Sequence, residues 1–365
     1  MQVSVAGTMI PVTAGRASAV QATQSVPDLV WHDVRDWGVE GRGWPADQMA
    51  RYFDRLPARA EGVVREAVWN LSRDSAGMLT GFHTDATEIH VRYRLFRDRV
   101  AMSHMPATGV SGIDLYGREP AGVWRWVGVT RPESQEYSGR VTDDLDPWNR
   151  AYRIYLPLYN GIDALEIGVA RDAEFQPSTP RSEKPILFYG TSITHGACAS
   201  RPGMCHPSIL GRRLDLPVID LGFSGNGRME PEVGALLSEL DPAVYVIDCL
   251  PNMTPEEVGS RTEPLIRQLR AARPTTPIVL VEDRTFGYAW IKARVREQHR
   301  ERREQLQRVF ARLQLEGMAD LYYLEGDGLL GDDSEGTTDG SHPSDLGFFR
   351  QANAFEPVLR EALGR

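Results

Sequence analysis

The segment Ile186-Leu187-Phe188-Tyr189-Gly190-Thr191-Ser192-Ile193-Thr194 runs from four apolar residues into a glycine and then a serine. Further short apolar runs follow it, at Val218–Leu221, Val244–Leu250, Ile278–Val281 and Leu321–Leu324. The segments between these runs have helical spacing. Strands that helices cover on both faces have this nearly continuous apolar character. From Lys184 onward the sequence therefore predicts a doubly wound α/β sheet.

Two helices can be placed within this half of the chain. Thr254-Pro255-Glu256-Glu257 predicts a helix start, in which Thr254 is the cap and Glu257 completes a capping box. A final helix is expected after Pro343, with an apolar face made of Phe348, Ala352, Phe355, Leu359 and Ala362. The basic run between Lys292 and Arg312 is interpreted as the solvated face of a long helix, with a binding patch as the alternative.

The first half of the chain has a different pattern. Short runs alternate apolar and polar residues, as at Ile89–Leu95, Val123–Val127 and Tyr152–Leu156. Several such strands predict an antiparallel sandwich, here expected to be jelly-roll-like. The polar, proline-containing stretch Gln176–Glu183 is a candidate junction. We expect an N-terminal extension (1–27), a β-sandwich accessory domain (28–176) and an α/β domain (184–365).

Composition narrows the classes of partner. The chain has 365 residues, 41% of them hydrophobic, and a formal net charge of -9. This acidic balance argues against a nucleic acid or an anionic membrane surface as partner. No apolar run approaches the roughly 18 residues that a membrane span needs. Residues 1–22 make a poor signal peptide, so a cytoplasmic location is the expectation.

The cysteines do not suggest a disulfide framework or a zinc site. The chain has three of them, Cys198, Cys205 and Cys249, without Cys-x-x-Cys spacing. Cys249 lies in an apolar run and is expected in the core. Whether Cys198 and Cys205 pair is left open. There is also no phosphate-binding loop motif and no run of metal-ligand spacing, so neither a cofactor nor a metal is expected.

Five residues supply the parts of an acyl-transfer site. Ser192, Gly225 and Asn252 each follow an apolar run, so they should gather at the carboxyl edge of a parallel sheet. Asp339 precedes His342 by three residues, and at this spacing a carboxylate can orient the imidazole. We predict Ser192 as nucleophile, His342 as base and Asp339 as its orienting acid. The oxyanion would be held by the backbone N–H groups of Ser192 and Gly225 and by the Asn252 amide.

Each of these residues also has an ordinary structural interpretation. A lone serine is more often a turn residue or helix cap. Asp339 can shape a glycine-rich turn, and His342 can cap the helix that follows. Gly222 is as easily a plain strand end as an oxyanion donor. His195 lies three residues beyond Ser192 but has no partner acid in the sequence, so we do not predict it as the base.

Together, Ser192, Gly225, Asn252 and His342 resemble the four sequence blocks of the SGNH-hydrolase superfamily, also called GDSL-like. Asp339 matches the acid of that family's D-x-x-H block. The resemblance covers about Lys184 to Arg365. Two blocks depart from the pattern: Thr191 stands where the family usually has Asp, and Leu250-Pro251-Asn252-Met253 keeps only the Asn.

A second resemblance lies in the first half. Gly112-Ile113-Asp114-Leu115-Tyr116 is similar to the Gly-x-Asp-Leu-Tyr signature of a β-rich module that precedes some SGNH hydrolases. Those relatives include enzymes that remove acyl groups from carbohydrates. Asp114 and Tyr116 are expected to be structural. Whether particular tryptophans form a sugar-stacking wall or the sandwich core stays open, namely for Trp124, Trp126 and Trp148.

These expectations combine into a two-domain esterase, a β-sandwich followed by a flavodoxin-like SGNH hydrolase domain. By resemblance, the substrate would be a small O-acyl ester, above all an acetyl ester on a sugar or oligosaccharide, cleaved without a cofactor. Two alternatives remain. One is a non-catalytic carbohydrate-binding protein with a lapsed hydrolase domain. The other is an acyltransferase or thioesterase that uses the same triad.

Overall fold

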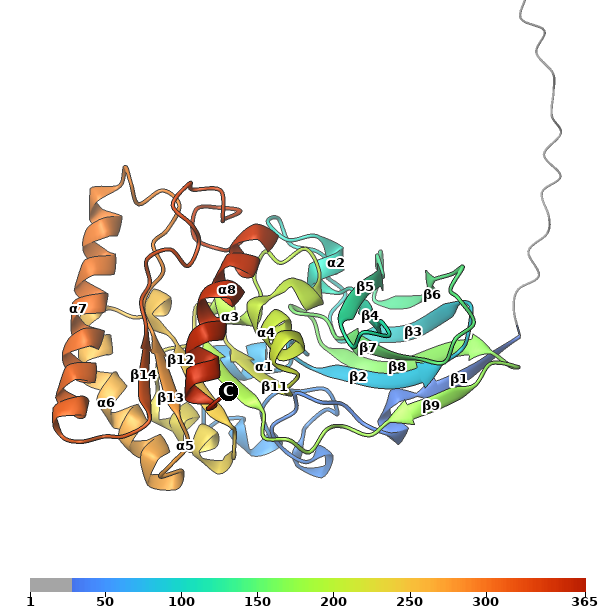
Figure 1. Cartoon of the computed structure of the whole chain (residues 1–365), viewed down its shortest axis with the longest axis horizontal. Coiled ribbons are helices and arrows are strands. Elements are labelled where there is room, and N and C mark those ends of the chain that lie inside the picture. The colour runs from blue at the N-terminus through green and yellow to red at the C-terminus, as the bar shows by residue number, and fades with distance from the viewer. Residues whose placement is uncertain (1–27) are drawn as a thin grey trace, which may run out of the picture.

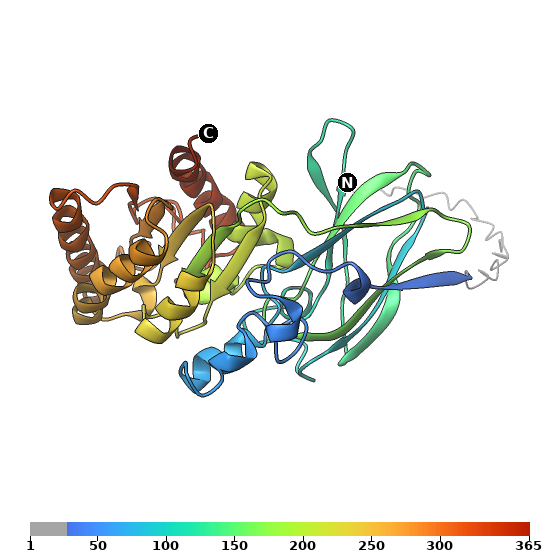
Figure 2. The ribbon, with the colours of Figure 1, turned by 90° about the horizontal axis from the view of Figure 1, so that it is seen from below.

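A computed structural model describes residues 28–365 (Figure 1). The extension expected at 1–27, and with it the judgement on a signal peptide, lies outside the described residues. Figure 2 shows a region of helices and strands beside a second region made mainly of strands. None of the helices in the described part combines the length and the apolar character needed to cross a membrane.

The second half of the chain forms one parallel sheet. Its strands are β10 (Ile186–Gly190), β11 (Val218–Gly222), β12 (Val244–Asp248), β13 (Ile278–Val281) and β14 (Leu321–Leu324). Their spatial order is β11-β10-β12-β13-β14, and every neighbouring pair is parallel. This is the flavodoxin-like strand order. The chain order reverses beside β10, because β11 lies on one side of it and β12 to β14 on the other. The predicted fold class is confirmed.

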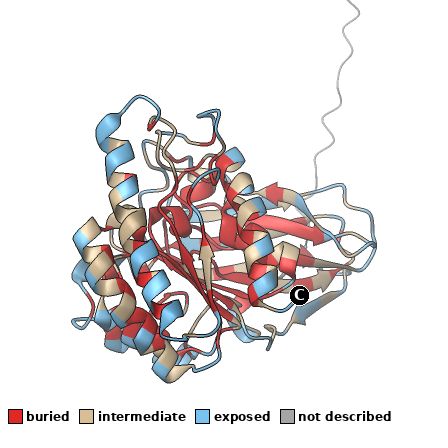
Figure 3. Cartoon of the chain, turned by 60° about the vertical axis from the view of Figure 1, so that its left-hand side comes forward, coloured by how far each residue is buried: buried red, intermediate tan, exposed pale blue. Residues whose placement is uncertain are grey.

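Helices cover both faces of this sheet, which buries the central strands (Figure 3). They are α3 (Ser192–His195), α4 (His206–Leu214), α5 (Pro231–Glu239), α6 (Pro255–Ala272), α7 (Ala293–Leu315) and α8 (Asp345–Ala362), with short 3-10 turns η4 (Pro202–Met204) and η5 (Leu250–Asn252). Apolar side chains of α5, α6 and α7 pack on one face and those of α3, α4 and α8 on the other.

The helix signals in the sequence are found where they were expected. Thr254 caps α6 in a complete capping box with Glu257. The final helix, α8, begins at Asp345, two residues after Pro343, and buries the predicted apolar face. The basic run lies in α7, where Arg300 pairs with Glu297 and Glu304 at the surface, as a solvated helix face should.

The first half forms two antiparallel sheets. One has the order β1-β8-β3-β6 and the other β5-β4-β7-β2-β9. The strands are β1 (Leu29–Asp33), β2 (Leu79–Thr84), β3 (Ile89–Leu95), β4 (Asp114–Arg118), β5 (Trp124–Val129), β6 (Glu136–Thr142), β7 (Arg150–Tyr155), β8 (Ile162–Ala170) and β9 (Phe175–Ser178). Side chains from both sheets, such as Val91 and Ile154, meet in one core, as in a sandwich. The expected junction differs in one respect, since its first residues belong to β9.

Segments between these strands reach the α/β sheet. The connections between the strands hold the 3-10 turns η1 (Val34–Asp36), η2 (Ala46–Gln48) and η3 (Ala58–Ala60) and the helices α1 (Glu66–Ser72) and α2 (Ala107–Val110). Of these, η1 packs in the sandwich core through Val34. Trp44, Leu56 and Trp69 belong to the same apolar core as β11 and α5, and Tyr159 belongs to the core under α4 and α8. The N-terminal half therefore supports the α/β domain as well as forming its own sandwich.

Candidate active site

The turn that carries Ser192 follows directly from the end of β10. Gly190 is the last strand residue, and a Cβ there would lie 2.1 Å from Thr194 Oγ1, so only glycine fits. Thr191 then caps α3, its hydroxyl accepting the Ile193 N–H at 3.3 Å. This capping hydroxyl of Thr191 stands where the SGNH-hydrolase block usually has an aspartate. Ser192 is the first residue of α3 and is 8% exposed.

Three side chains from two distant segments meet at this turn. Ser192 Oγ lies 2.9 Å from His342 Nε2. On the other side of the ring, His342 Nδ1 lies 2.7 Å from Asp339 Oδ2. The hydroxyl, imidazole and carboxylate therefore form one continuous hydrogen-bonded chain, in the order that general-base activation of a serine requires.

The loop around Asp339 fixes its charge. Its Oδ1 accepts the backbone N–H groups of His342 at 2.8 Å and Ser341 at 3.0 Å. Partial burial alone would raise the pKa of Asp339. The hydrogen bonds from His342 and Ser341 outweigh this effect and hold the pKa well below its usual range. Asp339 is therefore ionised throughout the range in which histidine titrates.

The ends of β11 and β12 lie level with Gly190, because Gly190 pairs in register with Gly222 and with Asp248. Beyond Gly222 the chain turns, and Gly225 has φ +70° with no other atom near the place of a Cβ. Gly222 itself is packed tightly, since a Cβ there would lie 2.1 Å from the His195 backbone nitrogen. Gly225 thus has an open backbone face and Gly222 does not.

Asn252 lies in η5 and packs against the Gly225 loop. Its amide has two orientations. In one, Nδ2 lies 3.4 Å from the Phe223 carbonyl oxygen. In the other, Oδ1 accepts the backbone N–H groups of Asn226 at 3.0 Å and Gly227 at 3.2 Å. We adopt the second, because it pairs two backbone donors and turns Nδ2 to the other side of the amide.

A buried polar cluster lies behind the Ser192 turn. Thr194 Oγ1 donates to Asp248 Oδ2 at 3.1 Å, and Arg284 binds both Asp248 oxygens at 2.7 and 2.8 Å. Arg284 also donates to Gln351 Oε1. All four side chains are inaccessible to solvent. The cluster ties α3, the end of β12, the segment after β13 and α8 together beneath the site.

The N-terminal half also contacts the site. Tyr159 donates its hydroxyl to the Ser192 carbonyl oxygen at 3.3 Å and stacks on the His195 ring at 4.1 Å. His195 Nε2 lies 3.3 Å from a guanidinium nitrogen of Arg55. Complete burial, together with the Arg55 charge, lowers the pKa of His195 well below its usual range. His195 is thus a neutral, buried imidazole between charged groups, since its Nε2 also lies 3.5 Å from Asp74 Oδ2. The acid that the sequence did not reveal comes from the N-terminal half.

Asp114 and Tyr116 join the two halves of the chain. Asp114 Oδ2 accepts Arg201 Nη1 at 2.9 Å and the Gly203 N–H at 2.8 Å, and Arg201 also donates to the Tyr116 hydroxyl. Arg201 and Gly203 belong to the loop between α3 and α4. The Gly-x-Asp-Leu-Tyr segment is thus an interdomain clamp on that loop, and the structural role expected for Asp114 and Tyr116 agrees with these contacts.

Two residues near the Asp339–His342 pair were not predicted from the sequence as part of the site. The His104 ring, from the N-terminal half, lies 6.0 Å from that of His342. Cys198 lies beside Asp339 and His342. No motif in the sequence links either residue to the site. Cys198 and Cys205 are both free and buried, so they do not pair, and Cys249 lies in the core as expected.

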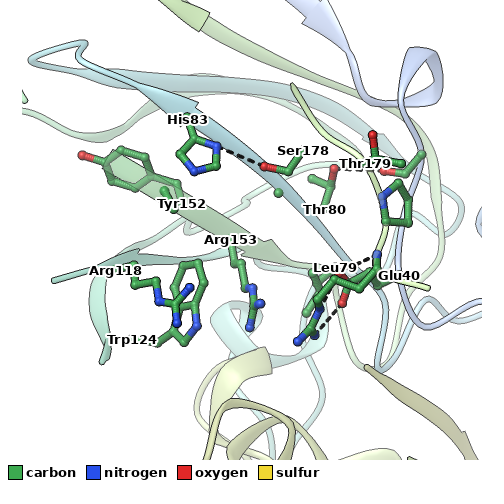
Figure 4. Close-up of a pocket in the computed structure, with 15 residues that line it drawn as sticks. Glu40, Leu79, Thr80, His83, Arg118, Trp124, Tyr152, Arg153, Ser178 and Thr179 are labelled. Carbon is green, nitrogen blue, oxygen red and sulfur yellow. Dashed lines mark hydrogen bonds and ion pairs between the residues drawn. The ribbon is translucent and has the colours of Figure 1, made fainter. Parts of the chain in front are cut away.

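The three tryptophans left open have different surroundings. Trp126 is 49% exposed, and its indole N–H binds Asp114. Trp148 is 57% exposed. Trp124 lines a cavity of about 140 Å³ in the sandwich domain, where the Arg153 guanidinium lies 4.0 Å from its ring centre (Figure 4). Neither Ser192 nor His342 lines this cavity, and Arg153 occupies one face of the Trp124 ring.

Both halves of the chain match known protein families. Residues 183–360 match the model of the GDSL-like Lipase/Acylhydrolase family. Residues 29–175 match the GxDLY model, described as the N-terminus of Esterase_SGNH_hydro-type proteins. Among curated proteins no match was found.

Several solved structures share the whole two-domain fold. A protein described as a GDSL-like lipase from Bacteroides ovatus is 30% identical, with a TM-score of 0.87 over 92% of this chain and 98% of the other. Salicylyl-acyltransferase SsfX3 from a tetracycline biosynthetic pathway is 18% identical, with a TM-score of 0.71 over 93% and 95%. An acetyl xylan esterase from the rumen bacterium Butyrivibrio proteoclasticus is 12% identical, with a TM-score of 0.56 over 92% and 99%. The chain belongs to the GDSL-like lipase/acylhydrolase (SGNH hydrolase) family, in the branch that carries an N-terminal GxDLY module.

Proposed function

We propose that the protein is a serine esterase that removes small O-acyl groups, acetyl above all, from a carbohydrate through an acyl-serine intermediate. The observation that carries the proposal is the hydrogen-bonded chain Ser192–His342–Asp339, with a distance of 2.9 Å between the hydroxyl and the imidazole. Family membership supports a hydrolase. The carbohydrate is supported by structural neighbours, among them a family two carbohydrate esterase from Clostridium thermocellum and the acetyl xylan esterase.

The proposed reaction has two displacements. His342 Nε2 accepts the Ser192 proton as Oγ attacks the ester carbonyl carbon. The oxyanion is held by the backbone N–H groups of Ser192 and Gly225 and by Asn252 Nδ2. The tetrahedral intermediate expels the sugar oxygen as an alkoxide, which takes the proton from His342 and leaves as the hydroxyl. A water molecule, deprotonated by the same imidazole, then attacks the acyl-serine and releases the acid.

Replacing Asn252 by alanine tests the oxyanion donor. We expect kcat for p-nitrophenyl acetate to fall by about 10²- to 10³-fold with little change in KM, because the donor binds charge that develops only in the transition state. Asn353→Ala, an exposed change on α8, is the control and should leave both constants unchanged. A folded Asn252→Ala variant with the wild-type kcat would remove Asn252 from the mechanism.

An exposed aromatic residue, Trp290, follows a segment that packs on the Asp339–His342 turn. In the segment after β13, the Gly287 N–H donates to the Gly340 carbonyl at 2.8 Å, and the Tyr288 ring packs so closely on Gly340 that a Cβ there would clash. Trp290, two residues on, is 72% exposed. We infer from this exposure, and from the nearness of Tyr288 in the sequence, that the Trp290 ring stacks on a sugar unit of the substrate.

Trp290→Ala should weaken the binding of an acetylated oligosaccharide more than the binding of a small ester. An aromatic contact contributes about 0.5–1.5 kcal/mol, so we expect KM for acetylated xylo-oligosaccharides to rise roughly 2- to 12-fold, measured as free acetate. KM for p-nitrophenyl acetate, which carries no sugar, should not change. Trp148→Ala is the matched control. Equal KM values for wild type and Trp290→Ala on every acetylated sugar would argue against sugar stacking on Trp290.

Transfer to an acceptor other than water is the second candidate, since the fold is shared with a salicylyl-acyltransferase. The same acyl-serine would then react with an acceptor hydroxyl. Measuring free acetate and acetylated acceptor together, in the presence of a sugar alcohol, separates the two outcomes. The esterase proposal expects free acetate as the main product.

A further inference from the structure

Cys198 places a third metal-binding group beside the Asp339–His342 pair. Its Sγ, one carboxylate oxygen of Asp339 and one ring nitrogen of His342 all lie within 4.8 Å of one another. Thiolate, imidazole and carboxylate are the three ligand types that Zn²⁺ takes in proteins. The pair is partly exposed, with side-chain exposures of 39% for Asp339 and 27% for His342, so an ion can reach it from solvent.

The backbone holds Cys198 in this place. Its φ is +71°, a left-handed conformation that residues other than glycine rarely adopt and that surrounding contacts must maintain. Ser200 provides these contacts two residues further on. Its carbonyl accepts the Thr108 hydroxyl at 2.6 Å, and its N–H and hydroxyl donate to Asp345. The sandwich domain and α8 together therefore fix the position of the thiol.

The thiol has no part in the proposed ester hydrolysis. Burial, with a smaller contribution from the Asp339 charge, raises the pKa of Cys198 to about 11. At neutral pH it is therefore a protonated, weakly nucleophilic group. A bound cation converts the thiol to a thiolate, because metal ligation displaces the thiol proton.

We propose that Cys198, Asp339 and His342 form a binding site for a thiophilic divalent cation, Zn²⁺ in particular, and that the bound ion inhibits the enzyme. The inhibition rests on the esterase proposed above, whereas the binding does not. The thiol gives its proton to solvent, and the ion accepts electron pairs from sulfur, nitrogen and oxygen. No oxidation or reduction is involved.

The geometry needs only a small adjustment. Zn²⁺ binds these donors at about 2.0–2.3 Å in a tetrahedron, so the ligand atoms come to lie about 3.3–3.8 Å apart. Separations of up to 4.8 Å must shorten by about 1 Å, and the Nδ1–Oδ2 distance of 2.7 Å must lengthen if the ion takes Nδ1. Water would be the fourth ligand. Ligation of the ion by either imidazole nitrogen would inhibit the enzyme. If the ion takes Nε2, the base loses its lone pair, and if it takes Nδ1, Asp339 no longer orients the ring.

The binding is tested with Cd²⁺ as a spectroscopic probe on the full chain. We expect one equivalent of Cd²⁺ to produce the ultraviolet charge-transfer band of a cadmium thiolate in the wild type. The matched control Cys249→Ala, which removes a thiol from the core, should keep this band. Cys198→Ala should lose it. A band that persists in Cys198→Ala, or that is absent from the wild type, overturns the site.

The inhibition is tested with Zn²⁺ on p-nitrophenyl acetate hydrolysis, each variant being compared with its own metal-free rate. The half-inhibiting Zn²⁺ concentration should rise at least about tenfold in Cys198→Ala, since loss of even an outer-shell partner costs 10- to 100-fold in metal affinity. A chelator should restore the wild-type rate. Equal inhibition of wild type and Cys198→Ala overturns the inhibitory role. If the wild type hydrolyses no ester, the esterase proposal fails, and the cadmium band still decides the site.

Discussion

Ser192→Ala is expected to lower kcat for p-nitrophenyl acetate by about 10⁴- to 10⁶-fold. The reason is that Ser192 is the hydroxyl on the catalytic nitrogen: its Oγ lies 2.9 Å from His342 Nε2, and Asp339 holds the ring from behind. The other hydroxyl near the ring, Ser341 Oγ, lies 3.4 Å from Nδ1, the nitrogen that faces Asp339. His342→Ala should cost about as much. Because the two residues act as a unit, the double variant should be little worse than either single one.

Ser260→Ala is the matched control for this experiment, since it removes an exposed serine hydroxyl from α6. It should retain the wild-type kcat. Equal nitrophenol release by wild type and Ser192→Ala would reject the esterase. The remaining interpretation would then be a carbohydrate-binding protein whose hydrolase domain is inactive.

The second large effect is on stability. Asp248→Ala should lower the free energy of unfolding by about 3–5 kcal/mol, because it leaves the Arg284 guanidinium buried without its bidentate partner. Thr194 would lose its acceptor as well. Since Thr194 lies two residues after Ser192, activity should fall together with stability. Urea unfolding, followed by circular dichroism, measures the change.

An exposed ion pair gives the comparison. Asp241→Ala removes a carboxylate that binds Lys184 at 2.8 Å, with both side chains more than half exposed. Surface pairs of this kind contribute about 0–1 kcal/mol. If Asp248→Ala were no more destabilising than Asp241→Ala, the buried cluster would not be holding the Ser192 turn in place.

The sequence was sufficient for the α/β half because its signals are local. A run such as Ile278–Val281 is apolar throughout because helices cover both faces of its strand, and the strand has the predicted bounds. The gathering of Ser192, Gly225 and Asn252 followed from the same reasoning, since each comes after a strand that runs in the same direction. Asp339 and His342 could be paired because only one turn separates them.

The rest depends on contacts between distant segments, which periodicity does not encode. Tyr159 and Arg55 lie in irregular connections of the N-terminal half, yet they reach the Ser192 turn and the His195 ring. Cys198 comes close to Asp339 only because α8 and the sandwich domain fix the loop between α3 and α4. A lone cysteine or tyrosine in a loop carries no local pattern from which such a neighbour could be predicted.

Covalent labelling of the nucleophile is the most direct test of the central claim. The protein is treated with a fluorophosphonate, and the modified residue is located by mass spectrometry of its peptides. We predict a single phosphonyl group on Ser192, formed much more slowly in His342→Ala. Labelling of a different residue, or undiminished ester hydrolysis by protein whose Ser192 is fully labelled, would contradict the proposed site.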